Sequence, residues 1–508
     1  MIFTAVKELH SKTEKSFFTE QTIVYTRLVE VYCEKNKKNI ETVSEIKSNI
    51  VDELISIGAI KKESDIPELK KLLGNGFGDF INAVNYVCRN YDDMGEVRPY
   101  LDKLYNSKRK IIQEEARKNS KYSLVDFFCG AGGLSLGFLQ AGFNVKLAND
   151  IEDVCIQTYK YNHPELPSDK LIQGDIKTIV DNIEDYIDND IDIVVGGPPC
   201  QGFSEANRQR VIDDPRNKLY KYFVKAVEKI VPKVVVMENV KGMLKVADQV
   251  VEDYEKLDAV KNGKHYKYKV SYQILNSHDF SVAQSRERLI YIALRDDVIK
   301  ENGVTPEDVF YKIHSNCKNN RTYILMDALN DIKPLEAPRI KNMNEIDSDI
   351  TGKKIDINYD EINDNQYLKL INMNRTIPYL FNHKARYLSD VNYEIYKRLG
   401  QGDDATDEKI KDIMPYAHRN HCFKDKYYKL IADRPCRTIT AHLRMDCHSH
   451  IHPYQVRALT PREAARVQSF PDDYLFWGAY LKTYMQIGNA VPTMMARGIA
   501  EAIKEYLK

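Results

Sequence analysis

Ile193-Val-Val-Gly-Gly-Pro-Pro-Cys-Gln-Gly-Phe-Ser204 is the stretch around which the rest of the chain is organised. Its apolar start is typical of a buried strand, which the glycines and prolines that follow cannot continue. Cys200 is therefore expected on a stiff turn at the end of a strand. Ligands of open α/β sheets bind at that edge, so a thiol there faces a cleft. Most cysteines are small buried hydrophobic residues, however, and position alone leaves both a nucleophile and a core residue open.

A second strand and turn precede this stretch. Leu124–Phe128 is predicted as a strand and Cys129-Gly-Ala-Gly-Gly133 as a glycine turn, with a helix after it. Such a turn lets the backbone approach a ligand, and the helix start offers free N–H groups. Asp150 closes the next strand, at the place of an acid that binds ribose hydroxyls. Because Ser135 replaces the third glycine of the dinucleotide fingerprint, a cofactor without a pyrophosphate is favoured, S-adenosylmethionine rather than NAD.

Two further strand ends carry acids. Asp175 is placed to bond an adenine amino group, while Ile151 and Ile176 could cover the faces of that ring. Glu238 ends an apolar strand rich in β-branched residues, so it is partly desolvated and could carry a proton near neutrality. A helix-capping or salt-bridged glutamate is the alternative interpretation.

Two arginines precede a later apolar strand. Arg286 and Arg288 are two residues apart on an extended segment and are expected to point the same way. They could reach a base oxygen, a phosphate or a carboxylate in the cleft. A surface ladder of ion pairs is the alternative.

The remaining chain divides by pattern. Residues 1–121 are predicted to be helical, and an accessory structural domain is favoured there over a DNA-contacting or partner-binding module. Strong periodicity fades after about Phe310, and basic and aromatic residues alternate between Pro415 and His452, as on nucleic-acid-binding surfaces. Thr460 and Glu463 predict a capping box at the start of a late helix.

Composition sets outer bounds on function. The 508 residues carry 74 basic and 74 acidic side chains, so net charge implies no partner. Nine scattered cysteines without a Cys-x-x-Cys pair predict reduced thiols. Cys447 with the alternating histidines 448, 450 and 452 lacks the spacing of a zinc site, so no metal is expected. No apolar run approaches the length of a membrane helix, and a cytoplasmic protein without membrane contact is expected.

The ordered motifs resemble those of the DNA (cytosine-5) methyltransferase family, over roughly residues 122–508. They are Asp126-Phe-Phe-Cys-Gly-Ala-Gly-Gly, Gly196-Gly-Pro-Pro-Cys-Gln-Gly-Phe-Ser, Glu238-Asn-Val, Gln284-Ser-Arg-Glu-Arg, Thr460-Pro-Arg-Glu-Ala-Ala-Arg and Gln486-Ile-Gly-Asn-Ala-Val-Pro. Asp150 stands where relatives often carry Glu, and Ala283 where many have Pro. Both departures keep a carboxylate and an extended segment. Residues 1–121 resemble nothing in the family's catalytic unit.

The resemblance implies an α/β, Rossmann-like fold of the S-adenosylmethionine-dependent methyltransferases, with a mostly parallel sheet. The expected division is a helical N-terminal accessory domain at 1–121, a catalytic domain that binds S-adenosylmethionine at 122–325, a smaller target-recognition domain at 326–440, and a part at 441–508 that completes the catalytic domain.

The resemblance also implies the chemistry. The Cys200 thiolate would attack C6 of a cytosine flipped out of double-stranded DNA, Glu238 would bond to N3, and C5 would take the methyl group. Arg286 is expected near the base O2 with Arg288 in support. The cofactor residues carried over or inferred are Phe128, Gly130, Gly132, Asp150, Ile151, Asp175, Ile176, Leu219, Asn489 and Val491, and the substrate-binding residues are Pro199, Gln201 and Ser204.

The leading hypothesis is a site-specific methylase, acting as a monomer, that protects DNA in a restriction-modification system with a cognate endonuclease encoded nearby. The family's tRNA-methylating branch shares the catalytic core, but its Cys-Phe-Thr signature is absent. A regulator that only binds DNA is the non-enzymatic alternative, and it would have no need of Cys200, Glu238 and Arg286 together.

Overall fold

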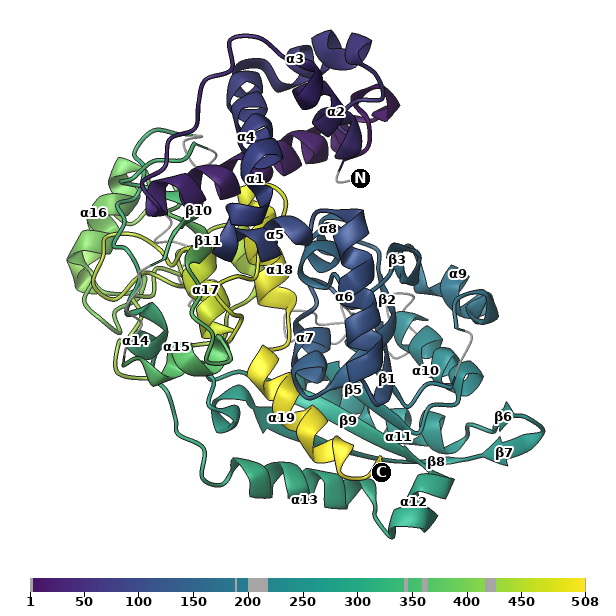
Figure 1. Cartoon of the computed structure of the whole chain (residues 1–508). Coiled ribbons are helices and arrows are strands. Elements are labelled where there is room, and N and C mark those ends of the chain that lie inside the picture. The colour runs from purple at the N-terminus through teal and green to yellow at the C-terminus, as the bar shows by residue number, and fades with distance from the viewer. Residues whose placement is uncertain are drawn as a thin grey trace.

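A seven-stranded sheet in the order β3-β2-β1-β4-β5-β9-β8 forms the middle layer of the α/β part of the chain (Figure 1). The computed structural model describes residues 3–187, 190–199, 218–341, 346–358, 364–415 and 426–507. The strands are β1 (Tyr122–Phe127), β2 (Phe143–Asp150), β3 (Leu171–Gln173), β4 (Ile193–Gly196), β5 (Val234–Asn239), β8 (Tyr268–Asn276) and β9 (Glu287–Arg295). The five strands β1–β5 run parallel, and β9 is antiparallel to both β5 and β8. The predicted mostly parallel sheet is confirmed.

Both faces of the sheet are buried, as the continuous apolar strands require. Alternate residues of β1 face opposite layers, so Leu124 joins one hydrophobic cluster and Val125 the other. One face is covered by α7 (Gly133–Gln140), α8 (Asp153–Asn162), α13 (Pro306–Cys317) and α19 (Thr493–Lys504). The other is covered by α9 (Ile176–Asp181), α10 (Lys218–Ile230) and α11 (Ala247–Glu255). The short helix α12 (Asp296–Asn302) and the small hairpin β6 (Ala259–Lys261) and β7 (Lys264–Tyr266) complete this part.

The last helix returns to the first layer of the sheet. α19 lies against α7, and the two backbones approach closely at Gly137. A Cβ at that position would stand 2.4 Å from the Cβ of Ala496, so only glycine allows the contact. The C-terminal residues therefore pack on the same sheet as residues 122–295.

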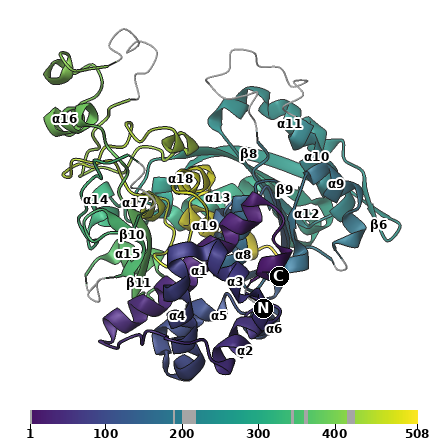
Figure 2. The same ribbon diagram turned by 90° about the horizontal axis from the view of Figure 1, so that it is seen from above.

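Residues 325–444 contain short elements joined by long irregular segments, as the fading periodicity predicts. They are α14 (Leu325–Leu329), β10 (Gly352–Ile357), α15 (Gln366–Ile371), β11 (Tyr379–Lys384) and α16 (Asp390–Arg398), followed later by α17 (Pro461–Val467) and α18 (Tyr480–Asn489). β10 and β11 form an antiparallel hairpin. The view from above in Figure 2 places α14–α16 to one side of the large sheet.

The N-terminal residues form a helical layer, as the apolar spacing predicts. Its helices are α1 (Lys12–Lys35), α2 (Ser48–Ser56), α3 (Ile66–Leu73), α4 (Phe77–Asn90), α5 (Arg98–Asp102) and α6 (Asn106–Asn119). Figure 1 shows α1 passing beside β10 and β11. Within the described ranges, every helix is too short or too polar to cross a bilayer.

The core of this helical layer extends into the rest of the molecule. Its hydrophobic cluster includes Tyr379 and Phe381 of β11 and Trp477 before α18. Polar contacts follow the same seam, because the carboxylate of Glu20 accepts the backbone N–H of Gly478 at 2.8 Å and also pairs with Lys354. The N-terminal layer thus shares one apolar core with the hairpin and with the C-terminal segment.

Trp477→Ala should destabilise the whole chain, because the indole is buried between Phe17 and Tyr161 in this shared core. Truncation of a buried tryptophan costs about 3–5 kcal/mol of unfolding free energy. We expect the apparent melting temperature to fall by several degrees in a thermal scan. Leu481→Ala, at an exposed position of α18, is the matched control and should have little effect. Equal melting temperatures for the two variants would contradict a shared core.

Candidate active site

The glycine turn after β1 is held in a conformation that few residues adopt. Phe128, Gly130 and Gly132 all have positive φ, at 57°, 53° and 89°. A Cβ on Gly132 would lie 2.6 Å from Nε2 of His163, so this position requires glycine. A Cβ on Gly130 would meet nothing within 4 Å, so the backbone there borders open space. The turn therefore presents bare main chain to a ligand at the carboxyl edge of the sheet.

Two predicted acids lie at the neighbouring strand ends. The carboxylate of Asp150 accepts the backbone N–H groups of Gly130 and Glu152, each at 2.9 Å. Burial raises the pKa of Asp150 above its usual value. Asp175 is exposed and caps the start of α9 by accepting the N–H of Lys177. The structure thus brings the glycine turn and both acids to adjacent strand ends, as predicted.

The other predicted cofactor residues differ in exposure. Ile151 is 67% exposed and Asn489 is also exposed, so both can contact a ligand. Leu219 is half-buried, while Ile176 and Val491 are buried. Ile176 packs into the cluster beneath α9 and α10, so its side chain serves mainly as core.

The turn after β4 leads toward the predicted nucleophile. The carbonyl of Pro198 accepts a hydrogen bond from the Asn239 side chain at 3.1 Å, and Pro199 is exposed. Cys200, Gln201 and Ser204 lie outside the described residues. A Cβ on Gly197 would stand 3.0 Å from Oε2 of Glu238. Glycine at this position therefore lets the Glu238 carboxylate lie against the turn that precedes Cys200.

The two predicted arginines have separate surroundings. Nε of Arg288 lies 2.8 Å from Oε1 of Glu238, and both side chains are largely buried. Arg286 is fully buried and donates to the carbonyls of Ile439 at 2.5 Å and Gly488 at 3.0 Å. Burial lowers the pKa of the Arg286 guanidinium well below its usual range. Arg288 is therefore the arginine that contacts the strand-end Glu238. Arg286, which the sequence placed near the base, instead donates its hydrogen bonds to two backbone carbonyls.

A cavity of about 490 Å³ borders Ser285, the residue before Arg286. Its lining combines Ser285 with residues between Tyr428 and Thr440, including Arg434 and Arg437. Arg437 lies over the ring of Tyr428 at 4.7 Å. The cavity thus joins the arginine segment to part of the stretch whose composition predicts a nucleic-acid surface.

Asp126 is a buried acid whose role the sequence did not indicate. Its Oδ2 accepts the hydroxyl of Ser135 at 2.6 Å, which in turn accepts that of Tyr159 at 2.8 Å, while Oδ1 has no partner among the described atoms. Burial raises the pKa of Asp126 to about 7. The one feature of the sequence that could have indicated this burial is the position of Asp126, a charged residue inside the apolar run of β1.

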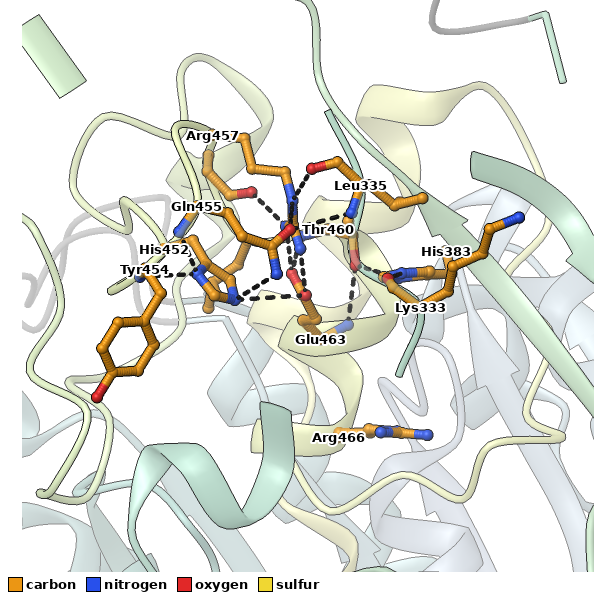
Figure 3. Close-up of polar contacts among 12 residues, drawn as sticks. Lys333, Leu335, His383, His452, Tyr454, Gln455, Arg457, Thr460, Glu463 and Arg466 are labelled. Atoms are coloured by element: carbon orange, nitrogen blue, oxygen red, sulfur yellow. Dashed lines mark hydrogen bonds and ion pairs between the residues drawn. The ribbon is translucent and has the colours of Figure 1, made fainter. Parts of the chain in front are cut away.

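The predicted capping box at Thr460 and Glu463 is confirmed and belongs to a buried network (Figure 3). Glu463 also accepts two hydrogen bonds from Arg457, both at 2.7 Å. Burial lowers the pKa of His452 to about 4 and that of His383 to about 3, so both imidazoles are neutral. His452 accepts two backbone N–H groups, and His383 bonds the Thr460 hydroxyl.

The cysteine and histidines considered for zinc have other partners. His448 stacks on Tyr427 with ring centroids 4.4 Å apart, and Cys447 lies 3.4 Å from the guanidinium of Arg386. Across the part of the chain that the structure describes, no three His, Cys, Asp or Glu side chains are grouped to hold a metal.

The strand order, the glycine turn and the acids at neighbouring strand ends define an α/β enzyme with the Rossmann-like methyltransferase fold. A family model described as C-5 cytosine-specific DNA methylase matches residues 122–505, and the chain belongs to that family. It is therefore a DNA (cytosine-5) methyltransferase.

Individual relatives agree with this assignment. The type II methyltransferase M.AgeI of Thalassovita gelatinovora is 30% identical, over 75% of this chain and 98% of its own length. M.DdeI of Desulfomicrobium norvegicum is 31% identical, over 76% of this chain and 89% of its own length. A solved structure of a protein encoded within an E. coli prophage has a TM-score of 0.57 at 24% identity, and the match covers 76% of this chain and 99% of that chain. That likeness concerns the fold.

Asp126→Asn should change how stability depends on pH. The folded pKa of about 7 exceeds the unfolded value of 3.8, so wild type loses unfolding free energy as pH rises between them, by up to about 1.4 kcal/mol per pH unit. The variant lacks this loss. The unfolding free energy of the variant minus that of wild type should therefore increase from pH 4 to pH 7 and then stay constant. Denaturant titrations at several pH values measure it, with the exposed Asp169→Asn as control. A difference that is constant with pH would contradict the buried-acid interpretation.

Proposed function

We propose that the protein transfers the methyl group of S-adenosylmethionine to C5 of a cytosine flipped out of double-stranded DNA, through a covalent bond between Cys200 and C6. The observation that carries this proposal is the Glu238–Arg288 pair. It lies against the turn before Cys200, at the same sheet edge as the glycine turn. An acid and a guanidinium beside the turn that precedes the expected nucleophile suit a ring that gains negative charge during attack.

The residues at the glycine turn fit a nucleoside cofactor. Open space borders Gly130, and the Asp150 carboxylate beside it can accept hydrogen bonds from ribose hydroxyls. Exposed Ile151 offers an apolar surface to an adenine face, and Asp175 an acceptor for its amino group. Phe128, Gly132, Leu219, Asn489 and Val491 would line the remainder. S-Adenosylmethionine supplies an electrophilic methyl group.

Each protein group has one part in the chemistry. The Cys200 thiolate forms a bond to C6, and the electron pair displaced from the ring double bond makes C5 nucleophilic. The Glu238 side chain bonds to N3 of the ring. Arg288 is held at Glu238 through Nε, and its Nη2 makes no hydrogen bond to a described residue, so it can donate to O2. After methylation, loss of the C5 proton to a base lets the C6–S bond break and returns the thiolate.

DNA must be distorted for this reaction, because C6 cannot be reached inside a duplex. The cavity beside the arginines, with Arg434, Arg437 and Tyr428 on its walls, has the cationic and aromatic lining that suits an extruded nucleotide and its phosphates. Pro199, Gln201 and Ser204 would contact the base, and residues 326–440 would read the surrounding sequence.

The relatives are type II methyltransferases, and this supports a proposal for the biological setting. We infer that the chain is the protective methylase of a restriction-modification system, a cytoplasmic monomer whose partner endonuclease cuts the same site. The helical 1–121 and the C-terminal 441–508 would support a catalytic unit at 122–325.

Mapping 5-methylcytosine is the direct test. The protein is incubated with S-adenosylmethionine and unmethylated genomic DNA, which is then sequenced for 5-methylcytosine. Methylation at one short recurring motif supports the proposal and gives the specificity. Methylated tRNA with unmodified DNA would favour the tRNA-methylating branch, and DNA binding without methyl transfer would favour a regulator.

The two arginines should respond differently to substitution. Arg288→Ala should lower kcat about 10²–10³-fold without unfolding the protein, because it removes a donor from the charged ring. Arg286→Ala should lower the melting temperature, because the carbonyls of Ile439 and Gly488 lose their donor.

Glu238→Gln should lower kcat about 10²–10⁴-fold, and Cys200→Ala should abolish turnover. A Cys200→Ala protein that still methylates DNA would refute the covalent mechanism.

Asp150→Asn should weaken cofactor binding. Hydrogen bonds to a charged group contribute about 1.5–3 kcal/mol, so the Kd for S-adenosylhomocysteine should rise about 10- to 100-fold in calorimetry. The adjacent exposed Glu152 pairs with Lys482 on the surface, and Glu152→Gln is the matched control. Unchanged affinity in both variants would place the cofactor elsewhere.

A further inference from the structure

A second cavity, of about 370 Å³, lies on the α6 side of β2, away from the candidate active site. Its walls come from α6 of the N-terminal layer, from residues 144–146 of β2 and from the segments near residues 165–170 and 186–191. β3 pairs only with the last three residues of β2, so the first half of that edge is not covered by a strand. Figure 1 shows α6 beside this part of the sheet.

Lys146 owes its position to a β-bulge. Leu124 of β1 pairs with Val145, and Val125 pairs with Leu147, so Lys146 is an extra residue without a partner in the ladder. Bulges re-aim a side chain out of the regular alternation, and here the re-aimed side chain lines the cavity. It is half-buried, and burial together with the nearby Arg117 lowers the pKa of its ammonium group.

The positive charges of Lys146 and Arg117 are not neutralised by any acid within the described part of the chain. Arg117 of α6 and Lys146 form no ion pair with a described acid. Of the two acids on the wall, Glu165 already bonds His163 at 2.9 Å. Lys110 and Lys170 add two more cations to the lining. Lys146 is half-buried and Arg117 is exposed, and two neighbouring cations without a counter-ion favour a bound anion.

A polar side chain in the same wall is available to a ligand. Asn144 is 6% exposed as a residue, and its amide makes no hydrogen bond to any residue that the structure describes. Its amide atoms are not among the buried polar atoms that lack a partner, so they face solvent and can bond a molecule in the cavity. Val145, Pro167 and Ile191 give the cavity apolar surface beside these polar groups.

We propose that this cavity binds a small molecule with a phosphate group, about the size of a mononucleotide. The phosphate would lie between Lys146 and Arg117 and bond Asn144, and the organic part would contact the apolar wall. The volume falls within the range of small-molecule sites. Roughly 20 Å of strand separates Asn144 from the carboxyl edge, so the site is distinct from the proposed cofactor pocket. A ligand there would join the N-terminal layer to the sheet.

AMP is the probe for calorimetry on the full chain, with saturating S-adenosylhomocysteine present to block the proposed cofactor pocket. We expect AMP to bind one site and adenosine not to bind. Lys146→Ala and Arg117→Ala should each raise the Kd at least 10-fold. Lys118→Ala, an exposed neighbour on α6 outside the cavity, should leave it unchanged. Methyl transfer should persist in all three variants, so failure of this site and of the proposed function can be told apart.

Two outcomes would overturn the proposal. Absence of AMP binding at millimolar concentration, or binding that both substitutions leave intact, would remove the site. Displacement of AMP by a 20-base-pair duplex, with weaker duplex binding in Lys146→Ala, would instead assign these cations to a DNA phosphate.

Discussion

A buried pair of charges, Arg457 and Glu463, connects the parts of this molecule. Both side chains are inaccessible to solvent, and the guanidinium donates two parallel hydrogen bonds to the carboxylate. Removing one member of such a pair leaves an uncompensated buried charge, which costs about 3–5 kcal/mol. The pair stands at the start of α17, where Arg457 also donates to the carbonyl of Leu335. Glu463 thus belongs to the cap of α17, while its partner Arg457 fixes a loop that precedes the β10–β11 hairpin.

The two arginines within α17 extend this connection. Arg462 donates to the carbonyl of Phe381 in β11, and Arg466 pairs with Asp472 and donates to the carbonyl of Asn330. Since Phe381 also belongs to the core of the N-terminal layer, the hairpin is held from two sides. The orientation of the proposed recognition region relative to the active site therefore depends on buried charges on one side and on apolar packing of the N-terminal layer on the other.

Local patterns in the sequence were sufficient for the strand ends, the glycine turn and the capping box, because each is set by residues close in the chain. They could not separate Arg286 from Arg288. Alternation places both on one side of an extended segment, but the carbonyls that engage Arg286 come from residues more than 150 positions later. The shared core of the N-terminal layer and the burial of Asp126 depend on long-range packing in the same way.

The bulge in β2 shows how one such detail sets two sites. Without it, Lys146 would pair opposite Val125 and enter the core beneath α9 and α10, and Leu147 would turn to the other face. With it, Leu147 fills that core and Lys146 leaves it, while Asp150 keeps the register that lets it accept the N–H of Gly130. One inserted residue therefore sets both the cation in the middle of β2 and the acid at its carboxyl end, which couples the geometry of the two proposed ligand sites through a single strand.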